Sequence, residues 1–148
     1  MALKGELTKL KITVLAEDSV SYESPYLGQH GVSFLMTADR EGVQKNILID
    51  VAQNPGALLD NMHMMDISPS CIDAVVLTHC HYDHIGGAAA IRDRYGCKIV
   101  AHTLDAVYLE SGNNDVTAAS WYGTKMAPLN IDHKFGGRKE SFKINSGE

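Results

Sequence analysis

The sequence predicts a layered α/β domain built on a mixed β-sheet, with helices packed against one face of the sheet. Three observations lead to this fold class. The first 50 residues are rich in strand patterns, the remainder alternates short apolar strands with helical patterns, and 45% of the 148 residues are hydrophobic. This length suits one ordinary domain, so we expect residues 1–148 to form a single domain with a small core.

The first half of the chain reads as three strands. Residues 10–16 are β-branched and partly alternating, which favours a strand, and a polar loop with three turn-forming residues follows over 19–31. Strands over 32–37 and 46–50 form a hairpin, because the turn residues of 39–42 separate them.

The second half reads as alternating helices and strands. Asn54 and Pro55 start a helix as its N-cap and first residue, and Ser68-Pro69 ends it. The wholly apolar residues 74–77 indicate a strand that is buried on both faces. The remaining expected elements are a helix from Gly86-Gly87 to Tyr95 stopped by Gly96, a strand over 97–101, a helix capped by Thr103 and ending near Glu110, an irregular polar stretch over 111–137, and a strand over 141–145.

Composition excludes several classes of protein. With 13 Lys+Arg against 18 Asp+Glu and no basic cluster, we expect no general nucleic-acid binding. No apolar stretch is long enough for a signal peptide or a membrane span, so we expect a cytoplasmic protein that does not enter a membrane. The three cysteines form no C-x-x-C pair, which favours reduced thiols.

A dense run of metal-ligand residue types, His79-Cys80-His81-Tyr82-Asp83-His84, directly follows the buried strand. In an extended chain alternate residues point the same way, so we expect His79, His81 and Asp83 to converge on one side. His84 breaks this alternation, so we expect it to point toward a second position nearby. The pattern predicts two adjacent metal ions, the first held by His79 and His81 and the second by Asp83 and His84.

Imidazole and carboxylate ligands without thiolate are typical of a catalytic zinc site with an open position, and iron or manganese would also suit them. Two such ions hold a bridging hydroxide and polarise the scissile oxygen of an ester, thioester, lactone, amide or phosphodiester. We therefore expect a dinuclear, zinc-dependent hydrolase of a small molecule, in which Asp83 is both a ligand and a catalytic residue.

The residues of this run resemble a known signature. Residues 78–87, Thr-His-Cys-His-Tyr-Asp-His-Ile-Gly-Gly, resemble the motif of the metallo-β-lactamase superfamily, and residues 73–109 are most similar to its glyoxalase II-like hydrolases. Residues 47–50 resemble the strand that ends in the first motif of the family, although Val51-Ala52 stands where Thr-Gly is usual. Residues 19–35 also resemble a branch of dihydropterin-linked phosphate synthases.

The resemblance implies the N-terminal half of an αββα sandwich, with Asp50 bracing the metal loop. It also implies that a later His, a bridging Asp and a final His complete the two metal sites. His102 ends a buried strand, where a hydrogen-bonded structural histidine is expected, and His133 is expected to be solvated. We therefore expect the chain to stop before the later ligand motifs, and to form a homo-oligomer or bind a complementing C-terminal chain.

Two other interpretations stay open. The chain could be a truncated, inactive domain that serves as a binding or assembly module, or an iron-dependent oxygenase on the same fold. The aromatic pair Trp121 and Tyr122 lies in the irregular stretch. Exposed aromatic residues in a loop often mark a substrate or subunit contact, and a small satellite core is the other explanation.

Overall fold

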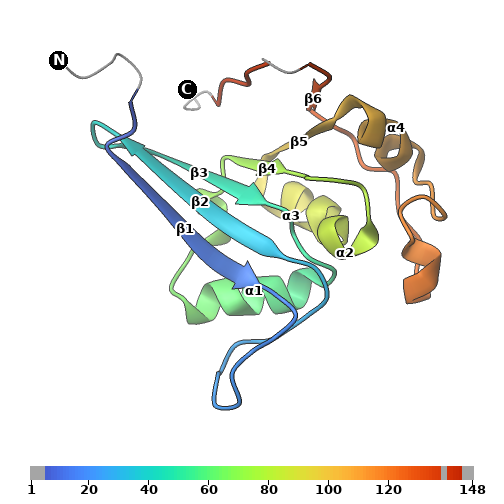
Figure 1. Cartoon of the computed structure of the whole chain (residues 1–148), viewed down its shortest axis with the longest axis horizontal. Coiled ribbons are helices and arrows are strands. Elements are labelled where there is room, and N and C mark those ends of the chain that lie inside the picture. The colour runs from blue at the N-terminus through green and yellow to red at the C-terminus, as the bar shows by residue number, and fades with distance from the viewer. Residues whose placement is uncertain (1–5, 138–139, 145–148) are drawn as a thin grey trace.

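The computed structural model describes residues 6–137 and 140–144, which form one mixed sheet with helices on one of its faces (Figure 1). All six strands belong to this sheet, in the spatial order β1-β2-β3-β4-β5-β6. The first three strands pair antiparallel, and β3 to β6 pair parallel. The elements in chain order are β1 (Lys9–Ala16), β2 (Ser33–Arg40), β3 (Val43–Ile49), α1 (Pro55–Met64), the 3₁₀ turn η1 (Pro69–Cys71), β4 (Ala74–Val76), α2 (Tyr82–Ile85), α3 (Ala88–Tyr95), β5 (Lys98–His102), α4 (Thr103–Ser111), the 3₁₀ turn η2 (Ala119–Tyr122) and β6 (His133–Phe135).

The hairpin and the helix ends follow the local sequence. Glu41 and Gly42 form the two-residue turn between β2 and β3, both with positive φ, as such hairpin turns require. Asn54 caps α1 as expected, because its side chain accepts hydrogen bonds from the backbone N–H groups of Gly56 and Ala57. Gly96 ends α3 in the left-handed conformation.

Three expectations about the second half are wrong. The N-cap of α4 is His102 rather than Thr103, because the Thr103 hydroxyl donates to Phe135 O at 2.9 Å and His102 Nδ1 accepts from Leu104 N. The stretch over 111–137 is not wholly irregular, since it contains η2 and β6. Residues 141–144 form no regular element in the structure, and Asn145 lies outside the described residues.

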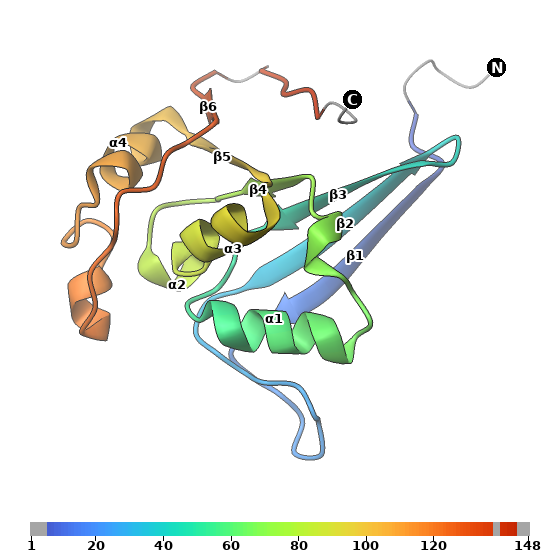
Figure 2. The ribbon, with the colours of Figure 1, turned by 180° about the vertical axis from the view of Figure 1, so that it is seen from behind.

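The helices cover one face of the sheet, which we call the core face (Figure 2). Leu48, Val75 and Ile99 point into it from the central strands and are fully buried. The same cluster takes in apolar side chains of α1, α3 and α4, with Leu58, Met62, Ile91, Ala106 and Leu109 as the main contributors. The core therefore lies between the sheet and the helices.

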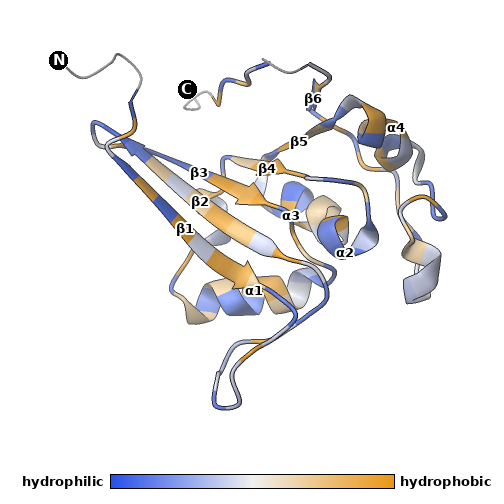
Figure 3. Cartoon of the chain, in the orientation of Figure 1, coloured by the Kyte–Doolittle hydropathy of each residue, from blue (hydrophilic) through white to orange (hydrophobic). Residues whose placement is uncertain are grey.

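The opposite side of the sheet, which we call the open face, is apolar and exposed along its antiparallel part. Leu10, Ile12 and Val14 of β1 are 50%, 61% and 48% exposed. The register aligns Ile12 with Met36 of β2, and Met36 with Ile47 of β3. Figure 3, viewed from this side, shows apolar residues along much of β1, β2 and β3, interrupted by polar ones. No helix in the described part of the chain is long and apolar enough to cross a membrane.

Candidate metal centre

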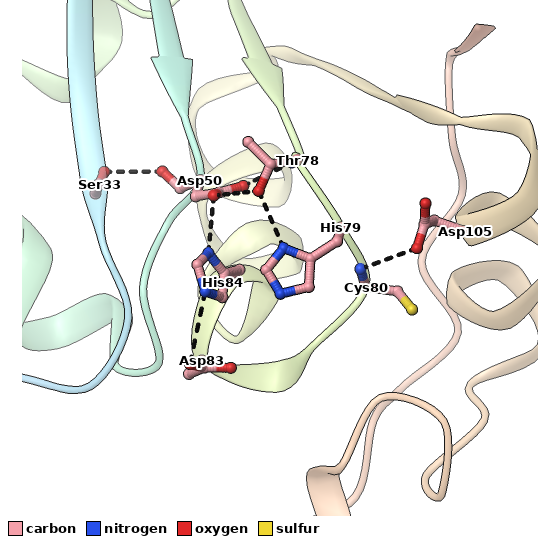
Figure 4. Close-up of polar contacts among 8 residues, drawn as sticks. All are labelled: Ser33, Asp50, Thr78, His79, Cys80, Asp83, His84 and Asp105. Atoms are coloured by element: carbon pink, nitrogen blue, oxygen red, sulfur yellow. Dashed lines mark hydrogen bonds and ion pairs between the residues drawn. The ribbon is translucent and has the colours of Figure 1, made fainter. Parts of the chain in front are cut away.

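The candidate ligands lie where the central parallel strands end. Asp50 directly follows β3, and the loop that carries His79, His81, Asp83 and His84 follows β4. Figure 4 shows Asp50 beside His79, Asp83 and His84. Because β3 and β4 are parallel neighbours, their carboxyl ends meet at one edge of the sheet. The sheet thus brings Asp50 to the histidine loop across 34 positions of sequence.

The loop changes from extended chain to helix inside the ligand run. His81 is still extended, with φ −70° and ψ 143°, and α2 begins at Tyr82. The alternation argument therefore holds for His79 and His81 only. His84, expected to point toward a second position nearby, has its ring centroid 4.1 Å from that of His79, closer than the 4.9 Å between His79 and His81.

A chain of hydrogen bonds fixes two of the imidazoles. Asp50 Oδ2 accepts the Thr78 hydroxyl at 2.6 Å and lies 2.8 Å from His84 Nδ1, while His79 Nδ1 lies 3.1 Å from Thr78 Oγ1. An ionised carboxylate only accepts, so His84 must donate from Nδ1. The single Thr78 hydroxyl proton goes to Asp50, so His79 must also donate from Nδ1. In its neutral form each ring then has an unprotonated Nε2, the atom that can bind a metal.

Burial and charge favour a neutral imidazole at His79. The pKa of His79 is lowered by burial first and then by the neighbouring His84 and His81 rings, which disfavour a second positive charge. The Asp50 side chain is only 2% exposed, whereas those of His84 and Asp83 are 19% and 26% exposed. Asp50, which accepts the hydrogen bonds, is thus buried, whereas the side chains of the candidate ligands His84 and Asp83 are partly exposed.

Backbone contacts hold the loop against the end of β3 and the N-terminal loop. Val51 N donates to His84 O at 2.9 Å, and Thr78 N donates to Asp50 Oδ1 at 2.8 Å. A Cβ on Gly31, whose φ is +82°, would lie 1.6 Å from Asp83 O, so only glycine allows this approach. Asp50 itself has a positive φ of 53°, which an aspartate adopts only when its surroundings require it.

Two further segments support the loop from α4 and the stretch before η2. Asp105, in the first turn of α4, accepts a hydrogen bond from Cys80 N at 3.2 Å. The Cys80 side chain is buried, and burial raises its pKa to about 11. Thr117 O accepts from Tyr82 N at 2.7 Å, which ties the stretch before η2 to the start of α2.

The predicted aromatic pair lies beside the ligand loop. The Tyr122 ring is 5.8 Å from the Tyr82 ring and 6.5 Å from the His30 ring, and Trp121 is 85% exposed. Burial and the nearby Asp83 carboxylate raise the pKa of Tyr122. The structure therefore brings Tyr122 to the site, with Trp121 next to it on the surface.

His102 and His133 lie apart from the ligand loop, whereas His30 is next to Gly31, which contacts it. His102 is an exposed N-cap residue of α4. His133, expected to be solvated, is half-buried in β6, with its ring 4.6 Å from Phe135 and 4.7 Å from Phe142 and with Nε2 lacking a hydrogen-bond partner. His30 contacts Asp18 at 3.4 Å and is largely exposed.

The donor set fits a metal ion in residue type and in the hydrogen bonds that orient two of its rings. His79 and His84 present Nε2, His81 adds an imidazole on the same loop, and Asp83 adds a carboxylate with Oδ2 3.6 Å from His84 Nε2. Within residues 6–137 and 140–144, however, no three His, Cys, Asp or Glu side chains are already arranged to hold an ion. Binding therefore needs local side-chain rearrangement.

Several supporting residues were not singled out by the sequence pattern. Thr78 was visible only as a flank of the histidine run, and its role depends on Asp50, which is distant in sequence. Gly31 and Thr117 act through backbone contacts, and Asp105 through a contact across 25 positions. Only the three-dimensional arrangement of the strands reveals these contacts.

Comparisons with known proteins agree with this geometry. A family model described as the metallo-beta-lactamase superfamily matches residues 31–139. The chain is 42% identical over 87 residues to 7,8-dihydropterin-6-methyl-4-(beta-D-ribofuranosyl)-aminobenzene-5'-phosphate synthase of Methanocaldococcus jannaschii, covering 59% of this chain and 30% of that protein. It is 36% identical over 90 residues to a metal-dependent hydrolase of Thermococcus onnurineus, covering 60% of this chain and 36% of that protein.

Solved structures show the same fold. A beta-lactamase from Chitinophaga pinensis superposes with a TM-score of 0.62 at 24% identity, over 80% of this chain and 44% of that one. The chain thus spans less than half the length of each of these three proteins.

Proposed function

Because this chain belongs to the metallo-beta-lactamase superfamily, we propose that it carries the ligand loop of a metal-dependent hydrolase. The observation that carries the proposal is the hydrogen-bonded series from His79 through Thr78 and Asp50 to His84. A series of this kind, in which each ring N–H is taken up by an acceptor so that the other nitrogen is free, is typical of metal-binding histidines.

Zinc is the proposed metal, with two ions at the complete site, and iron or manganese would suit the same ligands. When bound, such ions supply a water ligand of lowered pKa and polarise the scissile oxygen of the substrate. His79 and His81 would hold one ion, and Asp83 and His84 the other. Asp50 keeps His84 and, through Thr78, His79 in the orientation and tautomer that ligation needs.

The proposed reaction is hydrolysis of a small ester, thioester or lactone, as in the glyoxalase II-like branch that residues 73–109 resemble. The similarity to a metal-dependent hydrolase of Thermococcus onnurineus supports a hydrolase. The proposed location is the reducing cytoplasm, where free thiols are usual, and the three cysteines, Cys71, Cys80 and Cys97, are free thiols.

A second candidate function comes from the higher identity, 42%, to the archaeal phosphate synthase. The name of that relative describes a product with a dihydropterin and an aminobenzene ring. In this case the same metal loop would serve a synthase reaction on such ring compounds, with no hydrolysis of an ester or thioester.

Metal titration of the chain tests the metal site. Calorimetry with Zn²⁺ and the visible spectrum with Co²⁺ should show weak binding through nitrogen and oxygen ligands, which the double variant H79A/H84A loses. Binding is expected to be weak because no three-ligand set is arranged in advance among the described residues. A double variant that binds both ions as the parent does would overturn the proposed ligands.

Activity assays then separate the candidate functions. Turnover of an ester, a thioester and a lactone is measured with added Zn²⁺, against the same concentration of Zn²⁺ alone. Turnover that exceeds free Zn²⁺ and disappears in H81A supports the hydrolase. Metal binding without such turnover, together with binding of 7,8-dihydropterin compounds, would favour the synthase over the hydrolase.

A further inference from the structure

Three aromatic rings from three separate segments gather beside the ligand loop, and Trp121 is next in sequence to one of them. His30 comes from the loop before β2, Tyr82 from α2, and Trp121 and Tyr122 from η2. We call this group the aromatic wall. The Tyr82 and Tyr122 rings are 5.8 Å apart and tilted by 36°, and the His30 ring is 6.5 Å from that of Tyr122. Segments as far apart in sequence as His30 and Tyr122 therefore converge on one place.

The aromatic wall adjoins the proposed metal ligands. Tyr82 lies in sequence between His81 and Asp83, and its N–H is held by Thr117 O at 2.7 Å. The N-terminal loop reaches the same place, because Gly31, next to His30, packs against Asp83 O. A molecule that lay against these rings would thus have its neighbouring groups beside Asp83.

The turn that carries Trp121 and Tyr122 is firmly anchored. Thr117 is fully buried and its hydroxyl donates to Asn113 O at 2.6 Å, and Ala119 is also fully buried. Ala118 between them has a positive φ of 57°, an unfavourable conformation for a residue with a Cβ. The turn is therefore held in one shape by buried contacts on its inner side.

The outer side of this turn does not serve the core of the described chain. Trp121 is 85% exposed and Tyr122 is 36% exposed. A tryptophan that packed in a small satellite core would bury most of its large ring. A satellite core, the other explanation for this aromatic pair, therefore does not fit. What remains is an exposed aromatic surface, carried by an anchored turn, at the edge of the candidate site.

We propose that the aromatic wall stacks a planar aromatic ring of the substrate, so that the group on which the metal centre acts is placed beside Asp83. This inference rests on the proposed function of the ligand loop, and it adds the substrate class, which is a compound with a flat aromatic or heteroaromatic ring. Exposed tyrosine and tryptophan faces favour flat rings over saturated ones of the same size, because offset π-stacking adds to the burial of apolar surface.

The test uses a matched pair of neutral probes, 2-naphthamide and its fully saturated analogue, on the metal-free chain. Ligand-observed NMR gives the two affinities. The chain has a single tryptophan, so its one indole N–H resonance reports binding at Trp121 directly. We expect the aromatic probe to bind at least about fivefold more tightly and to shift this resonance.

Variants locate the probe. W121A and Y122A should each weaken binding of 2-naphthamide by up to about tenfold, whereas L104A, which removes a 70% exposed side chain from α4, should not. Thermal unfolding checks that all three variants fold. Equal affinities for the two probes, or an unshifted indole resonance, would overturn the proposal.

A third outcome points to a different role. If light scattering showed an oligomer that W121A dissociates, the aromatic wall would be a protein contact and the proposal would be wrong. Because the titration needs no metal, a failure of zinc binding leaves its result readable. Zinc binding without selectivity for the aromatic probe would refute only the proposed ring stacking on the aromatic wall.

Discussion

Asp50 Oδ2 lies 2.8 Å from His84 Nδ1 and accepts the Thr78 hydroxyl at 2.6 Å, so one buried carboxylate orients two candidate metal ligands. Replacing its oxygen by an amide nitrogen puts a donor where two donors already point. The preferred tautomers of His84 and His79 should then change. This relationship makes Asp50 the most informative position outside the ligands themselves.

Asp50→Asn should weaken zinc binding by about 10- to 100-fold, because hydrogen-bonding partners of ligating histidines commonly have effects of that size. Zinc calorimetry measures it. Asp73→Asn is the matched control, since Asp73 also accepts a backbone N–H, from Asn46 at 2.7 Å, but lies at the opposite end of β4. Equal losses of affinity in the two variants would mean that Asp50 acts only through stability.

Gly31→Ala should destabilise the fold and weaken zinc binding together. The new methyl group would collide with Asp83 O, and φ is +82°, so both the N-terminal loop and the ligand loop must move. We expect a loss of about 3 kcal/mol or more in the free energy of unfolding, measured with urea.

Gly42→Ala separates the cost of the positive φ from the cost of the collision with Asp83 O. Gly42 has nearly the same φ, +85°, but nothing lies within 4 Å of its missing Cβ. This variant should lose only about 1–2 kcal/mol, the cost of the left-handed conformation, and bind zinc normally. If Gly31→Ala were no worse than Gly42→Ala, the close contact with Asp83 would not be present in solution.

His81→Ala should abolish the zinc binding of the chain, whereas His133→Ala should leave it unchanged. The ring centroid of His81, on the ligand loop, is 4.9 Å from that of His79. His133, in β6, contacts Phe135 edge-on and stacks on Phe142. His133→Ala should instead lower thermal stability, because it removes an aromatic packing partner. Zinc calorimetry decides the first point, and equal zinc losses would show that the site is misassigned.

Cys80 should resist alkylation at neutral pH. Burial raises its pKa to about 11, so only about one thiol in a thousand is ionised at pH 8. Cys71 is half-buried and should react first, and the rate at Cys80 should rise about tenfold per pH unit up to pH 10 as the thiolate fraction grows. Mass spectrometry of iodoacetamide-treated protein measures both. Preferential labelling of Cys80 at pH 7 would show that the ligand loop opens.

Local sequence signals predicted much of the fold. The hairpin turn, the Asn54 cap and the Gly96 stop each depend on residues a few positions apart, and all three are present. The short apolar strands β4 and β5 were predictable because burial on both faces leaves a continuous apolar run.

The features that the sequence did not predict depend on contacts between residues that are distant in sequence. The three-residue strand β6 exists because it pairs with β5, with Val100 opposite His133, and its sequence His-Lys-Phe carries no strand pattern of its own. The ligand run was predicted by residue type, but the position of His84 was not. The change to helix at Tyr82 has no side-chain cap and depends on the backbone contact with Thr117.

The open face should make the isolated chain self-associate or bind a complementing chain. Leu10, Ile12 and Val14 are about half exposed or more and adjoin the apolar side chains of β2 and β3. Soluble monomers rarely expose a contiguous apolar patch of this kind, and covering each 100 Å² of it would gain about 2.5 kcal/mol. Ile12→Lys should therefore shift the chain toward monomer in light scattering at micromolar concentration and reduce binding of a hydrophobic dye. Leu104→Lys changes a more exposed side chain, 70%, on α4 and should alter neither. A parent chain that is already a compact monomer without dye binding would show that the open face is covered in solution.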